Sequence, residues 1–219
     1  MTSNAVRYND RMLKPGDKAP TFKLAAAGSK PGKTVALNDF AGSYVVLYFY
    51  PKDDTPGCTR QAQAFTEMGR AFAGLGATVL GVSRDTVARH ETFQKKYDLG
   101  VTLLSDPDLT AHKLYGTFGT KLMYGRATEG TIRTTFVIGP TGRIVSVFPK
   151  VRVDGHAEKV LDALREAQGL DTASEDDAPT ILAVKAPKSA KTATKKAPKK
   201  AAAKKVVAPK KPAARARKA

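Results

Sequence analysis

The run Tyr44-Val-Val-Leu-Tyr-Phe-Tyr-Pro-Lys-Asp-Asp-Thr-Pro-Gly-Cys58 joins two different sequence patterns through one loop. Residues 44–50 are continuously apolar, β-branched or aromatic, which is typical of a strand covered on both faces of a sheet. Pro, Asp and Gly then mark a loop, and a helix is predicted from Cys58. At a helix N-terminus, unpaired backbone N–H groups and the helix dipole favour a thiolate. This cysteine is therefore a candidate nucleophile.

The helix that begins at Cys58 is expected to extend to about Ala73. Apolar residues recur in it at three- and four-residue steps and form one stripe along the helix: Ala62, Phe65, Met68 and Phe72. Such a stripe packs a helix against the sheet that its neighbouring strands form.

Strands and helices continue to alternate beyond this helix. Strands are predicted over 77–83, 101–105, 131–138 and 143–148, and Gly-Pro-Thr-Gly joins the last two as a hairpin. Helices are predicted over 86–97, 108–115 and 154–168, whereas residues 116–130 are rich in glycine and are predicted to be irregular. In the last helix, Asp154 is the expected cap, and the inward positions are Val160, Leu161 and Leu164. The alternation predicts an α/β fold, a central mixed β-sheet flanked by helices, and fits a thioredoxin-like fold best.

Charge divides the 219 residues unevenly. Residues 185–219 contain 14 Lys and Arg and no acid, whereas residues 1–184 contain 23 basic and 20 acidic residues, a net charge of only +3. We expect a folded domain over 1–170, an acidic and polar linker over 171–184, and a disordered basic tail. The tail is mostly Lys, Ala and Pro, and it cannot bury enough apolar surface to offset the entropy of ordering.

The composition also argues against several classes of protein. One cysteine cannot form an internal disulfide, and the three histidines His90, His112 and His156 lack metal-ligand spacing. We expect each histidine on a helix surface and no metal site. The first ten residues lack the apolar core of a signal peptide, and no apolar run has the length of a membrane span. A reducing cytoplasm is the expected location.

The string from Tyr48 to Thr59 resembles the active-site signature of the peroxiredoxins, in particular the bacterioferritin comigratory protein or peroxiredoxin Q subfamily. The resemblance extends from about Leu13 to Leu170. Further matching strings are Leu104-Ser105-Asp106, Met123-Tyr124-Gly125, Arg133-x-Thr135-Phe136-Val137-Ile138 and Gly155-His156. It implies a thioredoxin fold that reduces hydrogen peroxide and organic hydroperoxides without a metal, haem or other cofactor.

The resemblance implies roles for four residues. Cys58 matches the peroxidatic cysteine, whose thiolate attacks the peroxide and becomes a sulfenic acid. Thr55 matches the residue whose hydroxyl bonds to thiolate and peroxide, Arg133 the distant arginine, and Pro51 the proline that shields the sulfur from solvent. The chemistry itself calls for positive charge near a thiolate and for donors near the departing oxygen. Read without the resemblance, Thr55 is a turn residue, Pro51 ends a loop and Arg133 pairs with a surface acid.

Two further features near the site concern its acids and its missing second cysteine. The adjacent acids Asp53 and Asp54 are expected to point to water, as loop acids usually do. Many members of the subfamily carry a resolving cysteine five residues after the peroxidatic one, but Gln63 stands at that position here. The resemblance therefore implies a one-cysteine cycle that needs an external thiol. The candidates are glutathione, another small thiol, a thioredoxin-type protein and a second Cys58.

The tail resembles those of linker histones and of some bacterial histone-like proteins. Dispersed lysines on a flexible chain suit non-specific binding to DNA or RNA phosphates, and no aromatic residue follows position 170 to stack on bases. The lysines most concerned are Lys195, Lys196, Lys199, Lys200, Lys204, Lys205, Lys210 and Lys211. The plain alternative is a charge run that aids solubility, and the tail could also bind an anionic membrane or a protein.

Three function classes follow. The favoured one is a thiol peroxidase tethered to nucleic acid and associated with the nucleoid. The second is a histone-like nucleoid-binding protein in which the peroxidase fold is secondary. The third, a thiol–disulfide oxidoreductase, is disfavoured because the chain has no Cys-x-x-Cys pair.

Overall fold

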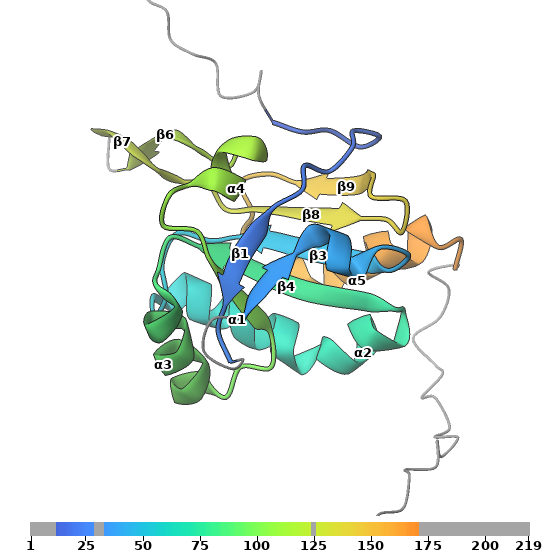
Figure 1. Ribbon diagram of the computed structural model, residues 1–219, viewed down its shortest axis with the longest axis horizontal. Coiled ribbons are helices and arrows are strands. Elements are labelled where there is room, and N and C mark those ends of the chain that lie inside the picture. Colours follow the sequence, from blue (N-terminus) through green and yellow to red (C-terminus); the bar gives the residue numbers. More distant parts are fainter. Residues whose placement is uncertain (1–11, 29–32, 124–125, 171–219) are drawn as a thin grey trace, which may run out of the picture. The chain divides into compact units, whose positions relative to one another are not determined.

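A computed structural model describes residues 12–28, 33–123 and 126–170 of the chain. The expected linker and basic tail lie outside these residues. The described part is the α/β domain that the alternating pattern predicts (Figure 1).

A seven-stranded mixed sheet forms the centre of the domain, in the order β2-β1-β5-β4-β3-β8-β9. Parallel pairing joins β3, β4 and β5, and antiparallel pairing adds β8 and β9 on one side and β1 and β2 on the other. The strands span β1 Lys23–Ala26, β2 Thr34–Ala36, β3 Tyr44–Phe49, β4 Ala77–Ser83, β5 Thr102–Ser105, β8 Thr134–Ile138 and β9 Ile144–Phe148.

The apolar run 44–50 contains the central strand β3. Alternate residues of the run enter opposite cores: Val46, Tyr48 and Tyr50 join the cluster that contains Cys58, and the residues between them join the other. Each residue from 45 to 50 is at most 1% exposed. Burial on both faces explains why the run has no polar positions.

Helices cover both faces of the sheet. The core on the Cys58 face includes side chains of α1 Pro56–Glu67, α2 Gly69–Gly74, α3 Val87–Tyr97 and α5 His156–Ala167. The other face is covered by α4 Thr110–Leu114, the 3₁₀-helix η2 Leu37–Phe40 and the chain before β1. Figure 1 shows α1, α2 and α3 on one side of the sheet and α4 on the other.

Two helix predictions need correction. The helix expected over 58–73 begins at Pro56, because a proline is favoured in the first helical turn, and it is interrupted at Met68 between α1 and α2. Gly155, with a φ of +66°, precedes α5 in place of the expected cap Asp154. The Asp154 carboxylate instead pairs with Arg60 at 3.1 Å.

The segment expected to be irregular, 116–130, contains a β-hairpin. Strand β6 Phe118–Met123 pairs antiparallel with β7 Arg126–Thr131 as a separate two-stranded sheet. The glycines obscured the pattern, since Gly119 pairs directly with Gly130 inside the ladder. Backbone pairing between the two strands forms this hairpin, and its C-terminal end leads into Arg133.

The three histidines are buried, contrary to expectation. His90 and His112 are 0% exposed and His156 is 4% exposed. Each has a polar partner: Asp53, Asp106 and Thr135, respectively. Satisfied hydrogen bonds make such burial tolerable, and sequence spacing does not reveal these partners.

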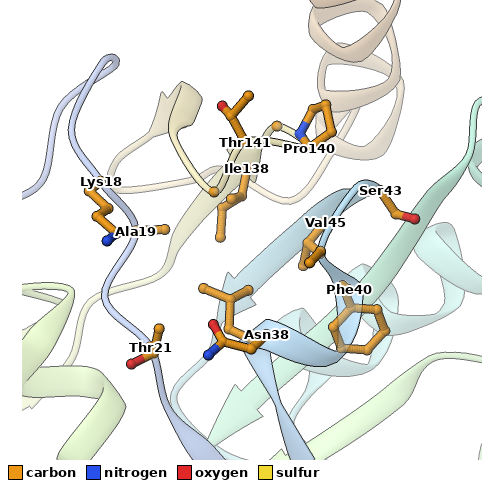
Figure 2. A pocket seen from close by; sticks show the side chains of 14 residues that line it. Lys18, Ala19, Thr21, Asn38, Phe40, Ser43, Val45, Ile138, Pro140 and Thr141 are labelled. Carbon is orange, nitrogen blue, oxygen red and sulfur yellow. The ribbon is translucent and has the colours of Figure 1, made fainter.

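A cavity of about 210 Å³ lies at one end of the sheet. Figure 2 shows side chains around it from η2, the start of β3 and the turn after β8, among them Phe40, Val45 and Pro140. Cys58 follows the opposite end of β3, so this cavity is separate from the predicted site.

Among the described residues, no helix is both long enough and apolar enough to cross a membrane.

Candidate active site

The end of β3 and the start of α1 place Cys58. The loop between them ends at Thr55, which precedes α1 in an extended conformation, and the first helical bond runs from Thr59 N to Thr55 O at 2.8 Å. Cys58 therefore lies in the first turn, where backbone N–H groups have no acceptor within the helix. Cys58 is only 2% exposed. The thiol therefore lies at a helix N-terminus, as predicted, and is covered by the surrounding residues.

Arg133 reaches this thiol from a distant part of the sequence. It lies in the short connection between β7 and β8, and its Nη2 is 3.2 Å from Cys58 Sγ. The two residues are 75 positions apart. The structure thus brings together the cysteine and the arginine that were predicted from the sequence. A guanidinium this close to a sulfur favours the thiolate form.

Gln61 completes this group, although sequence reasoning missed it. It is 1% exposed, and its Oε1 accepts a hydrogen bond from Arg133 Nη1. Its Nε2 has no hydrogen-bond partner within the described part of the chain. The available signal was spacing: a residue three positions after Cys58 lies on the same helix face.

Thr55 and Pro51 lie in the loop before the helix. The Thr55 hydroxyl donates to the carbonyl oxygen of Lys52 at 3.1 Å. A hydroxyl that donates there still presents lone pairs, so it can accept a hydrogen bond from a peroxide. Pro51, the first residue after the buried run, is partly buried.

Tyr48 lies in the same core cluster as Cys58. Its ring stacks on Phe65 at 4.9 Å and on Tyr50 at 5.5 Å between centroids. Burial, followed by the charges of Cys58 and Asp53, raises the pKa of Tyr48 far above its ordinary value. The phenol therefore stays protonated at neutral pH.

The two loop acids do not simply point to water. Asp53 is 2% exposed. The Asp54 carboxylate accepts bonds from Lys96 Nζ at 2.8 and 2.9 Å and from the Tyr97 hydroxyl at 2.6 Å. Lys96 and then Tyr97 lower the pKa of Asp54. Both partners belong to α3, a helix that the sequence does not connect with the loop.

His156 of α5 lies near Arg133, on the face of the sheet that carries Cys58. Its Nε2 is 2.8 Å from the hydroxyl of Thr135, two residues beyond the arginine. Burial, and then the positive charge of Arg133, lowers the pKa of His156 to about 4. The ring is therefore neutral at neutral pH, and its Nε2 shares a hydrogen bond with the Thr135 hydroxyl.

A thioredoxin-like sheet that places a covered thiol at a helix N-terminus, with a guanidinium on its sulfur, defines a thiol-dependent oxidoreductase. The family comparison agrees, since the model of the AhpC/TSA family matches residues 15–147. The chain belongs to this family.

Similar proteins of known sequence indicate which subgroup of the family the chain belongs to. The bcp protein of Coxiella burnetii is 44% identical over 152 residues, which cover 69% of this chain and 99% of the relative. Peroxiredoxin Bcp of Bacillus subtilis is 38% identical over 151 residues, or 69% and 94% of the two chains.

Solved structures give the same result. A cysteine-to-serine mutant of Xylella fastidiosa PrxQ is 38% identical, with a TM-score of 0.66, over 71% of this chain and 98% of that one. The bacterioferritin comigratory protein of Xanthomonas campestris, whose structures concern alkyl peroxide reduction, is 38% identical with a TM-score of 0.62, over 67% and 91%. The chain is accordingly a peroxiredoxin of the Bcp and peroxiredoxin Q group, an oxidoreductase with thiol peroxidase activity.

Proposed function

We propose that this protein reduces hydrogen peroxide and organic hydroperoxides in a one-cysteine cycle with Cys58 as the nucleophile. The observation that carries the proposal is the 3.2 Å contact between Arg133 Nη2 and the sulfur of the chain's one cysteine. The alkyl peroxide chemistry of the Xanthomonas campestris relative supports it.

In the first step, the Cys58 thiolate attacks one peroxide oxygen and the O–O bond breaks. The sulfur becomes a sulfenic acid, and the other oxygen leaves as hydroxide or alkoxide and takes up a proton to give water or an alcohol. Arg133 and the backbone N–H of Cys58 stabilise the developing negative charge. The Thr55 hydroxyl accepts a hydrogen bond from the peroxide and so orients the substrate. Pro51 limits access of water.

In the second step, an external thiol attacks the sulfenic sulfur, water leaves and a mixed disulfide forms. A second thiol then releases the Cys58 thiol and leaves as part of the oxidised disulfide. Gln63 occupies the position of a resolving cysteine, so no thiol of this chain traps the sulfenic acid. Because Cys58 is 2% exposed, the first turn of α1 must open to admit a glutathione or thioredoxin sulfur.

Peroxide consumption by Cys58→Ser tests this cycle. The serine variant should consume no peroxide, whereas the wild type treated with peroxide and a small thiol should gain the mass of one mixed disulfide. Full activity in Cys58→Ser would overturn the proposal. Parallel assays with glutathione and with a thioredoxin system would identify the better reductant.

We also propose that the basic tail, residues 185–219, tethers the enzyme to nucleic acid in the nucleoid. Its 14 basic residues without one acid support this role, and binding through phosphates should weaken steeply with salt. Gel shifts should show salt-sensitive DNA or RNA binding by the full chain and none by a chain ending at Pro179. Binding that survives truncation would exclude the tail.

The alternative is a histone-like protein in which the peroxidase fold is secondary. The phenotypes of two variants in cells distinguish it from this proposal. The alternative requires Cys58→Ser to keep the cellular role and the tail deletion to lose it. A tethered peroxidase requires both changes to lower protection of DNA against peroxide.

A further inference from the structure

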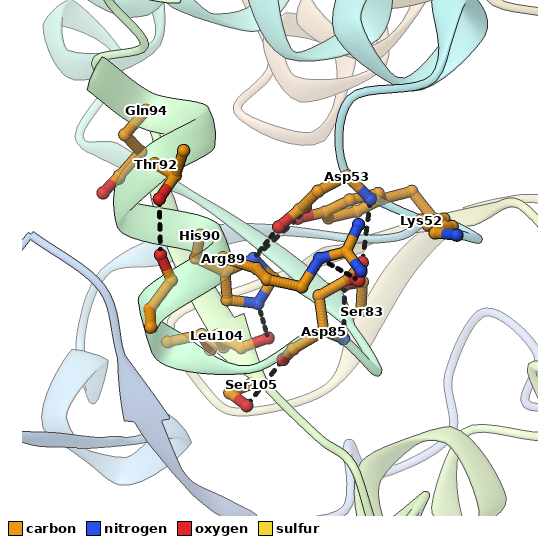
Figure 3. A network of polar contacts seen from close by, with 12 residues as sticks. Lys52, Asp53, Ser83, Asp85, Arg89, His90, Thr92, Gln94, Leu104 and Ser105 are labelled. Carbon is orange, nitrogen blue, oxygen red and sulfur yellow. Dashed lines mark hydrogen bonds and ion pairs between the residues drawn. The ribbon is translucent and has the colours of Figure 1, made fainter. Parts of the chain in front are cut away.

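The side chain of Asp53 is the centre of a buried hydrogen-bond network at the loop between β3 and α1 (Figure 3). Its Oδ2 is 2.7 Å from His90 Nδ1, and its Oδ1 accepts the Tyr50 hydroxyl at 2.7 Å. The far nitrogen of the same ring, Nε2, is 3.2 Å from the carbonyl oxygen of Leu104. The histidine thus joins the loop to β5 through helix α3.

The hydrogen atoms of this network can be counted. A carbonyl oxygen only accepts, so His90 Nε2 carries a hydrogen. Burial raises the pKa of Tyr50 well above its ordinary value, so its hydroxyl keeps its hydrogen and donates it to Asp53. One more hydrogen must then lie between Nδ1 and Oδ2, because two lone pairs at 2.7 Å would repel. The Asp53–His90 pair therefore holds that proton and has no net charge.

The other charged groups around the pair are already balanced. Asp85, after β4, accepts the backbone N–H of Asp53 at 2.8 Å and the Ser83 hydroxyl at 2.9 Å. Its second oxygen pairs with Arg89 of α3 at 3.2 Å. His90 is thus the group that compensates Asp53.

This compensation matters because Asp53 borders the core cluster that contains Cys58. Its Oδ1 binds the hydroxyl of Tyr50, a member of that cluster whose ring stacks on Tyr48. Asp53 also precedes Cys58 by only five residues, and both groups raise the pKa of Tyr48. An uncompensated carboxylate in that low-dielectric region would disfavour a thiolate beside it.

We propose that His90 is a positioning residue for the peroxidase site: it fixes the loop between β3 and α1 through Asp53, and it cancels the charge of that carboxylate, which lies five residues before Cys58. The proposal rests on Cys58 being the reactive thiol. It assigns to a histidine outside the active-site motif the task of keeping the thiolate available.

Alkylation of Cys58 by iodoacetamide across the pH range tests this assignment in the full chain. With one cysteine, the mass shift reports Cys58 alone. The plateau of the rate reports access to the sulfur, and the midpoint of the pH profile reports the charge around it. In His90→Asn the midpoint should rise by about one pH unit, since one uncompensated like charge has an effect of that order. Peroxide consumption below that midpoint should fall about tenfold.

A second change separates charge from structure. Asp53→Asn in the His90→Asn background removes the carboxylate, so the midpoint should return to the wild-type value. Loss of a merely structural contact would make the double variant no better than His90→Asn. Asp53→Asn alone should leave the midpoint at or below that of wild type, and this arm holds even where His90→Asn folds poorly.

The matched control is His112→Asn. It breaks the other buried histidine–aspartate pair, His112 Nδ1 to Asp106 Oδ2 at 2.6 Å, in the core on the opposite face of the sheet. Its midpoint should equal that of wild type. An unmoved midpoint in His90→Asn, a failed rescue, or a rise in Asp53→Asn alone would each overturn the proposal. A wild type that alkylates normally but consumes no peroxide would refute the proposed function instead.

Discussion

Gln61 holds the guanidinium of Arg133 at the sulfur of Cys58. The arginine donates through one nitrogen to Gln61 and through the other to Cys58. The amide does this at a cost, because its own Nε2 is buried with no partner in the described ranges. In the proposed mechanism Gln61 therefore weakens the fold while it orients the cation at Cys58, so function and stability conflict at this residue.

Replacing Gln61 by leucine should expose this conflict. Gln61→Leu removes the unsatisfied amide and the acceptor of Arg133, so the melting temperature should not fall while the rate of peroxide reduction falls about tenfold, the worth of a charge-assisted hydrogen bond. Thermal unfolding and initial rates measure the two effects. Gln63→Ala, two positions along the same helix, is the control and should keep its rate. Equal rates for Gln61→Leu and wild type would remove Gln61 from the site.

At the scale of elements, β3 leads through the loop into α1 and pairs in parallel with β4. Gly81 of β4 lies directly under the Tyr48 ring: a Cβ added there would be 2.5 Å from Tyr48 Cζ and 2.9 Å from Leu103 Cδ2. A glycine in a buried parallel strand is thus required by the close approach of an aromatic ring from β3.

Gly81→Ala should destabilise the domain by about 1–3 kcal/mol, because the added methyl overpacks a closed core. Urea unfolding measures the change. Gly74→Ala serves as the comparison: no atom lies within 4 Å of its added Cβ, so it should be neutral or slightly stabilising. If the two variants unfold alike, Tyr48 has room to move and the packing argument is wrong.

Some of these elements could be predicted from the sequence and others could not. Residues 77–83 and the central strand carry a strong local signal, and the structure places strands there. The hairpin β6–β7 was missed because backbone pairing between glycine-containing strands needs no apolar pattern. The burial of His90 and His156 was missed because their partners, Asp53 and Thr135, come from other segments of the chain.

At the scale of the whole molecule, His156 links stability to pH. Its pKa is about 4 in the folded protein and near 6.5 in the unfolded chain. Between these values the unfolded chain binds the proton and the folded one does not, so stability falls as the pH drops.

Unfolding free energy should therefore fall by about 2 kcal/mol between pH 7 and pH 5 through this residue. His156→Gln, whose side chain does not titrate, should lose less over the same interval. Urea unfolding of both proteins at the two pH values gives the difference. Equal losses would show that His156 is protonated in the folded protein as readily as in the unfolded chain.

The sequence by itself determined the central strand, the α/β class and the family, because these depend on neighbours along the chain. Cys58, Thr55 and Pro51 are proposed as site residues from the same short segment. The sequence also located the basic charge in residues 185–219. Only the tertiary structure brought Arg133 to Cys58 and Gln61 to Arg133, and buried Asp53 against His90. Those contacts join segments tens of residues apart, and hydrogen bonds that must be satisfied in a closed core decide them.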